Sequence, residues 1–162
     1  EIFSKPTYKF HIRELAKLTS LNPNTIINLT KELLKQEIIK QEKKKHLTDI
    51  YFNFNNPQAI IQKKLFNLHQ LYGSEIINFI KERYNSEAII LIGSYSRGED
   101  IERSDIDLVV IAKDKEIINL EKFEKILNRK IQLMPISYKD MSEEFYINLI
   151  NGIVLEGYLK RK

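Results

Sequence analysis

Two aspartates separated by a single residue, Asp105 and Asp107, begin an apolar segment that runs to Ile111. Successive side chains of a β-strand point to opposite faces, so this pair is expected on one face, roughly 6–7 Å apart along the strand. Two carboxylates placed in this way can bind one or two divalent cations. Mg²⁺ commonly binds through one or two carboxylates and takes substrate phosphates as further ligands. The pair therefore predicts metal-assisted chemistry on a phosphorylated substrate.

Gly93 and Ser94 supply the second half of the pattern. They follow the apolar run 88–92, which is typical of a buried strand, and ten residues separate Ser94 from Asp105. Glycine lets the backbone turn and approach a ligand closely. Ser94 brings a hydroxyl and an amide N–H to an expected helix start, which suits a phosphate oxygen. The spacing therefore predicts a phosphate-binding turn beside the two carboxylates.

Two other interpretations of this segment were weighed. A turn followed by a strand with capping aspartates would explain Asp105 and Asp107 alone, but it does not require Gly93 and Ser94 at this spacing. A P-loop is excluded because Glu99 and Asp100 follow the second glycine, where that motif needs Lys and Ser or Thr.

The sequence LIGSYSRGEDIERSDIDLVV, from Leu91 to Val110, resembles the signature of the nucleotidyltransferase superfamily that includes DNA polymerase beta. It looks most like the minimal nucleotidyltransferases of archaea and bacteria, and the resemblance covers roughly 84–157. The resemblance implies transfer of a nucleotidyl group, expected to be AMP, from a nucleoside triphosphate to an acceptor hydroxyl. It implies that Asp105 and Asp107 are catalytic and bind Mg²⁺ or Mn²⁺. The nucleotide-binding residues that it implies are Gly93, Ser94, Arg97 and Ser104. Arg97 would contact a phosphate, and Ser104 would orient Asp105 or cap the turn; a solvated arginine and a turn serine are the alternatives.

One position departs from the family pattern. A third carboxylate normally lies on the next core strand, and the corresponding segment here, 130–136, places Gln132 opposite the aspartate pair. In the family that carboxylate assists the second metal or the attacking hydroxyl, whereas glutamine is neutral and a poor base. The substitution implies weakened or lost transferase chemistry with nucleotide binding retained. Alternatively, Glu99, Asp100, Glu102 or a partner supplies the missing charge.

Charge divides the chain into a basic and a neutral part. Residues 1–57 contain ten Lys and Arg against six Asp and Glu, which accounts for the whole formal net charge of +4. The remaining residues contain equal numbers of basic and acidic side chains. A basic module joined to a neutral one suggests a polyanionic partner for the first, although a solubilising lysine-rich surface would look similar.

The N-terminal pattern favours nucleic acid as that partner. A short amphipathic helix at 11–18, a second helix from Pro23 to about Glu37 with Asn22 as its N-cap, and two strands around a basic turn resemble a winged helix-turn-helix domain. The second helix would enter the DNA major groove. The expected DNA-binding residues are Asn24, Thr25, Asn28 and Lys31 on that helix and Lys43, Lys44 and Lys45 in the hairpin, or wing. A surface for protein interaction or dimerisation is the alternative.

These features predict an α+β chain with three parts. Residues 1–56 form a winged helix-turn-helix, expected to be truncated at its start; residues 57–84 form a helical connector; residues 85–162 form a small mixed-sheet nucleotidyltransferase domain with flanking helices. The chain has no cysteine, and no stretch has the roughly 18 apolar residues of a membrane span. A cytoplasmic protein without a membrane partner is expected.

Two functions from different classes remain open at this stage. The first is a nucleotidyltransferase with a DNA-binding module. Some relatives of this size modify a partner protein. The second is a DNA-binding transcriptional regulator or antitoxin-like protein, whose impaired transferase domain senses nucleotide or neutralises a protein partner. Duplex DNA is the expected partner in both, and a homodimer is an additional expectation.

Overall fold

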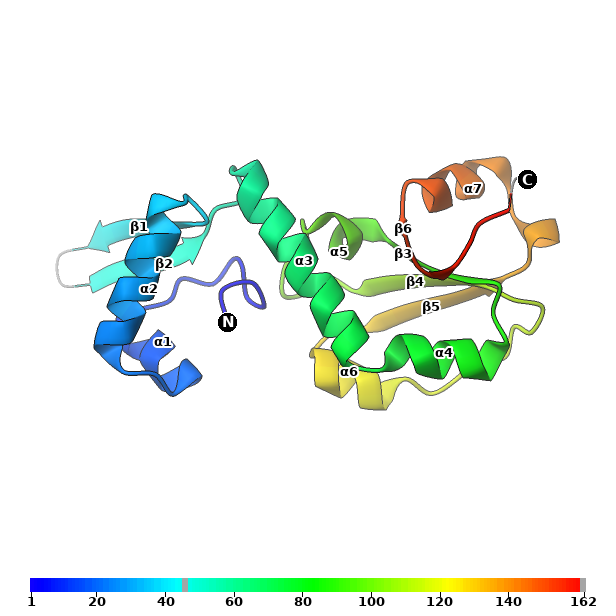
Figure 1. The fold of residues 1–162 in the computed structure, drawn as a ribbon, viewed down its shortest axis with the longest axis horizontal. Coiled ribbons are helices and arrows are strands. Elements are labelled where there is room, and N and C mark those ends of the chain that lie inside the picture. Colours follow the sequence, from blue (N-terminus) through cyan, green and yellow to red (C-terminus); the bar gives the residue numbers. More distant parts are fainter. Residues whose placement is uncertain (45–46, 161–162) are drawn as a thin grey trace. The chain divides into compact units, whose positions relative to one another are not determined.

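The computed structural model describes residues 1–44 and 47–160. The chain forms two compact units, Glu1–Lys63 and Lys64–Lys162, and helix α3 (Pro57–Gly73) contributes residues to both (Figure 1). The segment 57–84, predicted as a connector, is therefore divided between the units. No helix in the described ranges combines the length and the apolar character that crossing a membrane requires.

The first unit begins with two helices and continues with a hairpin. Its elements are α1 (Ile12–Thr19), α2 (Pro23–Lys35), β1 (Ile39–Lys44) and β2 (Leu47–Phe52), and the two strands are antiparallel. The predicted cap of the second helix is confirmed, because the Asn22 side chain accepts a hydrogen bond from the Asn24 N–H and Pro23 follows as the first helical residue.

A small apolar core holds the first unit together. Phe10 pairs with Ile50 in an isolated bridge, and both are buried with Ile26 of α2. The apolar spacing of α2 predicts that Leu29 is buried, but this residue is 49% exposed. Thr30 is buried instead, and its hydroxyl donates a hydrogen bond to the Ile26 carbonyl. The buried stripe of α2 is centred between Ile26 and Thr30, and Leu29 lies at the margin of this stripe.

The second unit is a mixed four-stranded sheet with helices on both faces. Its elements after α3 are α4 (Ile76–Tyr84), β3 (Ala88–Ile92), α5 (Gly93–Arg97), β4 (Ile106–Ile111), α6 (Glu121–Leu127), β5 (Ile131–Ile136), the 3₁₀ turn η1 (Tyr138–Asp140), α7 (Glu143–Ile150) and β6 (Ile153–Gly157). The strand order is β5-β4-β3-β6, with β3 antiparallel to both neighbours and β4 parallel to β5. The predicted α+β class with a mixed sheet is confirmed.

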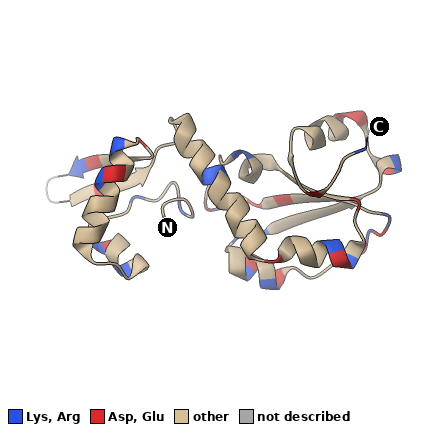
Figure 2. Ribbon diagram, in the orientation of Figure 1, with Lys and Arg blue, Asp and Glu red and all other residues tan. Residues whose placement is uncertain are grey.

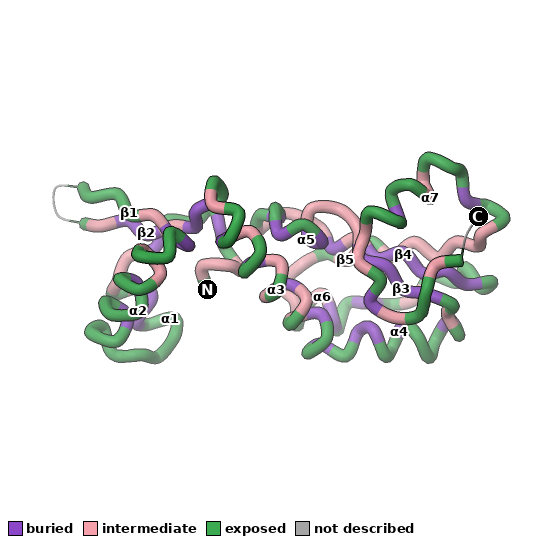
Figure 3. Tube along the Cα trace, turned by 45° about the horizontal axis from the view of Figure 1, so that its top comes forward, coloured by how far each residue is buried: buried purple, intermediate pink, exposed green. Residues whose placement is uncertain are grey.

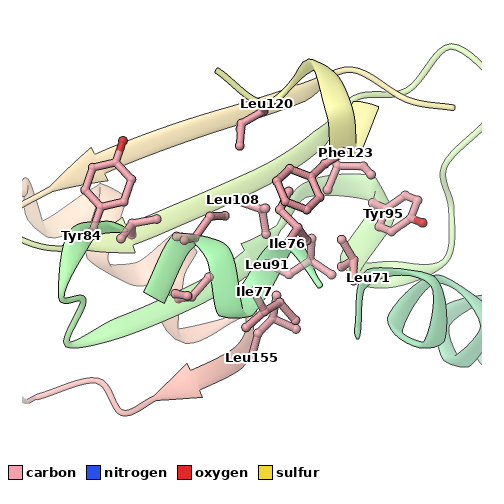
Figure 4. Packing of buried hydrophobic residues seen from close by; sticks show 14 of the residues in the cluster. Leu71, Ile76, Ile77, Tyr84, Leu91, Tyr95, Leu108, Leu120, Phe123 and Leu155 are labelled. Carbon is pink, nitrogen blue, oxygen red and sulfur yellow. The ribbon is translucent and has the colours of Figure 1, made fainter. Parts of the chain in front are cut away.

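The two faces of the sheet carry different parts of the core. Leu91 and Leu108 pack with Ile76 of α4 and Phe123 of α6 on one face (Figure 4). Ile90, Val109 and Ile111 pack toward α7 on the other face. The central strands β3 and β4 are buried along most of their length (Figure 3). Side chains alternate along a strand, so Asp107 shares the α7 face with Val109 and Ile111.

β5 is an edge strand whose outer side is protected. The Ile106 N–H donates to the Lys130 carbonyl and the Ala112 N–H donates to the Ile136 carbonyl, so the even-numbered residues of this segment bond to β4. The backbone N–H and C=O groups of the odd-numbered residues of β5 therefore face away from β4. Pro135 has no N–H to offer there, and the N–H of Ile131 donates to a Glu124 carboxylate oxygen at 3.1 Å.

Candidate active site

The Asp107 carboxylate lies against the backbone of Gly93. The two meet where β3 ends and β4 begins, because Ile92 pairs with Asp107 in the antiparallel ladder. A Cβ atom at Gly93 would lie 2.2 Å from Asp107 Oδ2, and Gly93 has a φ of +74°. Glycine is required here both for its backbone conformation and for the space that the carboxylate occupies.

Gln132 completes this end of the sheet. It pairs with Asp107 in the parallel ladder, and its side-chain amide donates a hydrogen bond of 2.7 Å to Asp105 Oδ2. The predicted position of Gln132, facing the aspartate pair, is confirmed. The amide orients one oxygen of Asp105 and brings no charge.

Electrostatics at the pair favour a cation. Burial raises the pKa of Asp107, and the negative charge of Asp105 raises it further. Across the described residues, no group of three or more His, Asp or Glu side chains is arranged to hold a metal ion. Asp105 and Asp107 carry like charges, and the Gly93 backbone lies close to Asp107. The pair fits a divalent cation whose remaining ligands are oxygens of substrate and water.

Of the other predicted nucleotide-binding residues, Ser94 and Arg97 lie in α5, and Ser104 directly precedes Asp105. Ser94 is in the first turn of this helix, next to Gly93. Arg97 is exposed, and its Nε lies 2.7 Å from a Glu99 carboxylate oxygen. The hydroxyl of Ser104 accepts a hydrogen bond from the Ile101 N–H, so this serine closes the turn before Asp105. The structure thus brings Gly93 next to the carboxylates and gives Arg97 and Ser104 local partners.

A buried polar network fixes the loop that leads to Asp105. Asp100 is 1% exposed and accepts a hydrogen bond of 2.7 Å from Asn67 of α3. The same Asn67 amide group donates to the Tyr95 carbonyl. Arg129 lies just before β5, with Nη2 at 3.6 Å from Asp100 and Nη1 donating to the Glu102 carbonyl. The network joins α3, the end of α5, the loop and the start of β5.

Sequence reasoning missed this network. Asn67 and Arg129 were not predicted as site residues, and Asp100 was considered as a replacement for the third carboxylate. That possibility was wrong for Asp100, because its carboxylate is buried with Arg129 and Asn67. A charged residue within a loop ordinarily indicates solvent exposure, so the sequence carried no signal for its burial.

The predicted DNA-binding residues lie on the surface of the first unit. Those of α2 are all exposed: Asn24, Thr25, Asn28 and Lys31. Lys43 and Lys44 are exposed on β1, and the Lys44 ammonium forms an ion pair with the buried Asp49. Lys45 lies outside the described residues. The described residues that are predicted to bind DNA therefore lie on two elements of the first unit, α2 and β1.

Comparisons with known proteins agree with the predicted nucleotidyltransferase domain. The family model for the nucleotidyltransferase domain matches residues 74–155. The chain belongs to this nucleotidyltransferase family. Two proteins of Methanocaldococcus jannaschii, each named "Putative protein adenylyltransferase", are similar to it. One is 40% identical, over 34% of this chain and 62% of the relative; the other is 38% identical, over 52% of this chain and 65% of the relative. The chain thus spans less than two thirds of either relative.

A solved structure is also similar. It is described as the crystal structure of a putative nucleotidyltransferase from Sulfolobus solfataricus. The alignment has 15% sequence identity and a TM-score of 0.36, and it covers 66% of this chain and 98% of that chain.

Substituting Gly93 tests the close approach of Gly93 and Asp107. Gly93→Ala is expected to lower Mg²⁺-dependent ATP affinity by roughly 10- to 100-fold, because the new methyl group displaces the carboxylate of Asp107, a predicted metal ligand, by an ångström or more. The left-handed backbone adds a destabilisation of about 1–2 kcal/mol. Isothermal titration calorimetry and thermal unfolding measure the two effects. Gly73→Ala is the matched control, since nothing lies within 4 Å of a Cβ there. Equal ATP affinity in both variants would contradict the geometry.

Proposed function

We propose that this protein transfers a nucleotidyl group, AMP from ATP, to a hydroxyl of an acceptor in a reaction that requires Mg²⁺ or Mn²⁺. The observation that carries the proposal is the packing of the Asp107 carboxylate on the Gly93 backbone, with Asp105 two residues earlier, in a chain of the nucleotidyltransferase family. The relatives named as protein adenylyltransferases support AMP as the transferred group.

Each residue then has a distinct role. Asp105 and Asp107 would hold the metal, which supplies charge stabilisation for the phosphates during in-line displacement. The backbone of Gly93 leaves room for a phosphate to approach the carboxylates, and the Ser94 amide and hydroxyl offer donors to it. The Gln132 amide keeps Asp105 oriented through its 2.7 Å hydrogen bond. Arg97 contributes to phosphate binding if it leaves Glu99 when nucleotide binds.

Gln132 is the feature of the site that weighs against catalysis of the transfer. A neutral amide cannot take the proton of an acceptor hydroxyl, so the site lacks one general base that the family pattern would supply. A specific alternative follows: a regulator or antitoxin-like protein that binds nucleotide and a protein partner without transferring AMP. Glu102, one of the carboxylates that could supply the missing charge, lines the same surface cleft as Asp105.

The position of the transferred label separates these functions. With Mg²⁺ and a cell lysate as source of acceptors, label from α-³²P-labelled ATP is expected to become covalently attached to an acceptor, whereas label from γ-³²P-labelled ATP is not. A Gln132→Asp variant is expected to transfer faster. Tight binding of ATP and Mg²⁺ without covalent label from either position, in wild type and variant alike, would favour the nucleotide-sensing regulator.

We further infer that the first unit is a winged helix-turn-helix that binds duplex DNA. Its order of elements, two helices followed by an antiparallel hairpin, supports this, as does the exposed polar face of α2. β1 carries three lysines, and α2 carries Lys31 and Lys35 near its end (Figure 2). The ion pair with Asp49 occupies Lys44, so Lys43 is expected to contribute more to phosphate binding than Lys44.

Salt dependence of DNA binding tests this inference. Replacing Lys31, Lys43 and Lys44 with Ala is expected to weaken duplex binding and to reduce the slope of log affinity against log salt by up to about 0.9 for each lost phosphate contact. Fluorescence anisotropy with a labelled duplex measures both quantities. Alanine at three exposed lysines of the second unit, Lys113, Lys122 and Lys139, is the control. An unchanged slope would indicate that the first unit contacts protein, including a second copy of this chain.

A further inference from the structure

Residue 132 forms one wall of the candidate active site. Gln132 is exposed, and it is the direct neighbour of Asp107 across the parallel ladder, where adjacent strands lie roughly 4.7–4.9 Å apart. Its side chain is on the same face of the sheet as Asp107, because Met134 and Ile136 of the same strand pack toward α7. A ligand held by the aspartate pair therefore meets the side chain of residue 132.

The Gln132 amide holds one oxygen of Asp105. Its N–H donates to Asp105 Oδ2 at 2.7 Å, so a partly positive hydrogen lies where a cation shared by residues 105 and 132 would sit. A cation and an N–H donor repel each other at such a position. Asp105 therefore offers a cation its other oxygen, Oδ1, and Asp107 offers its own carboxylate. The pair with Gln132 beside it provides carboxylate ligands for a single cation.

The charge of the site also matches one divalent cation. Sites that bind two metal ions hold them about 3.5–4 Å apart, and anionic ligands must offset the repulsion between the ions. Asp105 and Asp107, when ionised, carry two negative charges, which one Mg²⁺ neutralises. Among the described residues, no three His, Asp or Glu side chains are grouped so that they could hold a metal ion. A second cation at the pair would have no protein carboxylate of its own.

The acidic residues of the loop before Asp105 are engaged elsewhere. Glu99 forms an ion pair on the surface, and Asp100 forms one inside the buried network. Glu102 lines a cleft walled by α6, and this helix packs on the face of the sheet opposite to Gln132. These contacts leave the position of the third carboxylate to Gln132 alone.

We propose that the site binds one divalent cation together with the nucleotide, and that Gln132 excludes a second cation. The inference rests on the proposed nucleotidyl transfer and defines the metal content of that same site. A pair of cations stabilises both the attacking and the leaving oxygen of an in-line displacement. With one cation at the phosphates, the acceptor hydroxyl depends on the protein and on water for the removal of its proton.

Counting bound Mn²⁺ tests the inference. The nucleotide is α,β-methylene-ATP, whose bridging carbon prevents transfer, and calorimetry first establishes that its Mn²⁺ complex binds the protein. Mn²⁺ is then titrated into protein and analogue at equal concentrations, and electron paramagnetic resonance measures the free ion. Wild type is expected to bind one Mn²⁺ per complex. Gln132→Glu keeps the size of the side chain and supplies a carboxylate. This variant is expected to bind two, with the magnetic coupling of ions about 3.5–4 Å apart.

The control and the overturning results are distinct. Gln62→Glu makes the same change at an exposed residue of α3 and is expected to keep one Mn²⁺ per complex. Two Mn²⁺ in wild type, or only one in both Gln132→Glu and Gln132→Asp, would overturn the inference, whereas label in the lysate assay would still support the transferase. One Mn²⁺ in wild type and two in the acidic variants, without label in that assay, would support the inference and count against the transferase. Failure of the Mn²⁺ complex of the analogue to bind would overturn both.

Discussion

An Asp105→Asn/Asp107→Asn variant is expected to lose Mg²⁺-dependent ATP binding, with an affinity at least about 100-fold below wild type. Changes to the outer partners of metal ligands already alter metal affinity by roughly 10- to 100-fold, and these two residues are the proposed ligands themselves. Isothermal titration calorimetry with Mg²⁺ and with EDTA measures the effect. Wild-type ATP affinity that is the same in both solutions would contradict the assignment of the pair as metal ligands.

Loss of folding does not explain the expected result. Burial and the charge of Asp105 raise the pKa of Asp107, so the folded protein disfavours the ionised carboxylate. A neutral asparagine removes this unfavourable interaction, and the free energy of unfolding measured without metal is expected to stay unchanged or to increase. Thermal unfolding of wild type and double variant in EDTA provides this control.

The same pKa shift predicts the pH dependence of metal binding. Asp107 must be ionised to bind a cation, and it becomes protonated as the pH falls through its raised pKa. Mg²⁺-dependent ATP affinity is therefore expected to decline at a higher pH than for an ordinary aspartate. In the Asp107→Asn single variant this part of the pH profile is expected to disappear.

Arg129→Met is expected to destabilise the second unit by about 3–5 kcal/mol. The Arg129 and Asp100 side chains are only 7% and 1% exposed, and removing one partner of a buried ion pair leaves the other charge without compensation. Hydrogen exchange of the β3 and β4 amides reports the stability of this unit. An Arg129→Met/Asp100→Leu double variant is expected to recover much of the loss, because no single charge then remains buried.

A surface ion pair of the same loop provides the comparison. Arg97 and Glu99 form a close ion pair, with side chains 57% and 54% exposed. Arg97→Met is expected to stay within about 1 kcal/mol of wild type, since solvent screens exposed pairs. If Arg129→Met cost no more than Arg97→Met, the buried network would not hold the loop that leads to Asp105.

The local parts of the candidate site could be predicted because their signals are local. The run 88–92 is apolar throughout, as a fully buried strand requires, and Gly93 interrupts it where the backbone reaches Asp107. The position of Gln132 followed from counting along the next apolar segment, and the ladder between β4 and β5 bears this out. Whether these residues bind metal and nucleotide stays a prediction.

Other predictions failed where polar side chains compete with apolar periodicity. The spacing of Ile117, Leu120, Phe123 and Leu127 predicts a helix from Asp114 to about Asn128. In the structure α6 begins at Glu121, and Ile117 is 94% exposed. Asp114 accepts a hydrogen bond from the Glu116 N–H, and Asn119 accepts one from the Glu121 N–H. Such side-chain bonds offer the backbone an alternative to helix. The network of Asn67, Asp100 and Arg129 escaped prediction because its members are far apart in the sequence.

The protected edge of the sheet has a consequence for self-association. A strand added beside β5 would need hydrogen-bond donors from the outward-facing residues 131, 133 and 135. Pro135 has none, and the Ile131 N–H is already held by Glu124, which leaves Leu133. Pairing of two β5 edges into one continuous sheet would therefore form few hydrogen bonds, which disfavours the edge-to-edge stacking that starts many aggregates. A homodimer, if one forms, is expected to use a surface other than the β5 edge, such as the opposite sheet edge at β6.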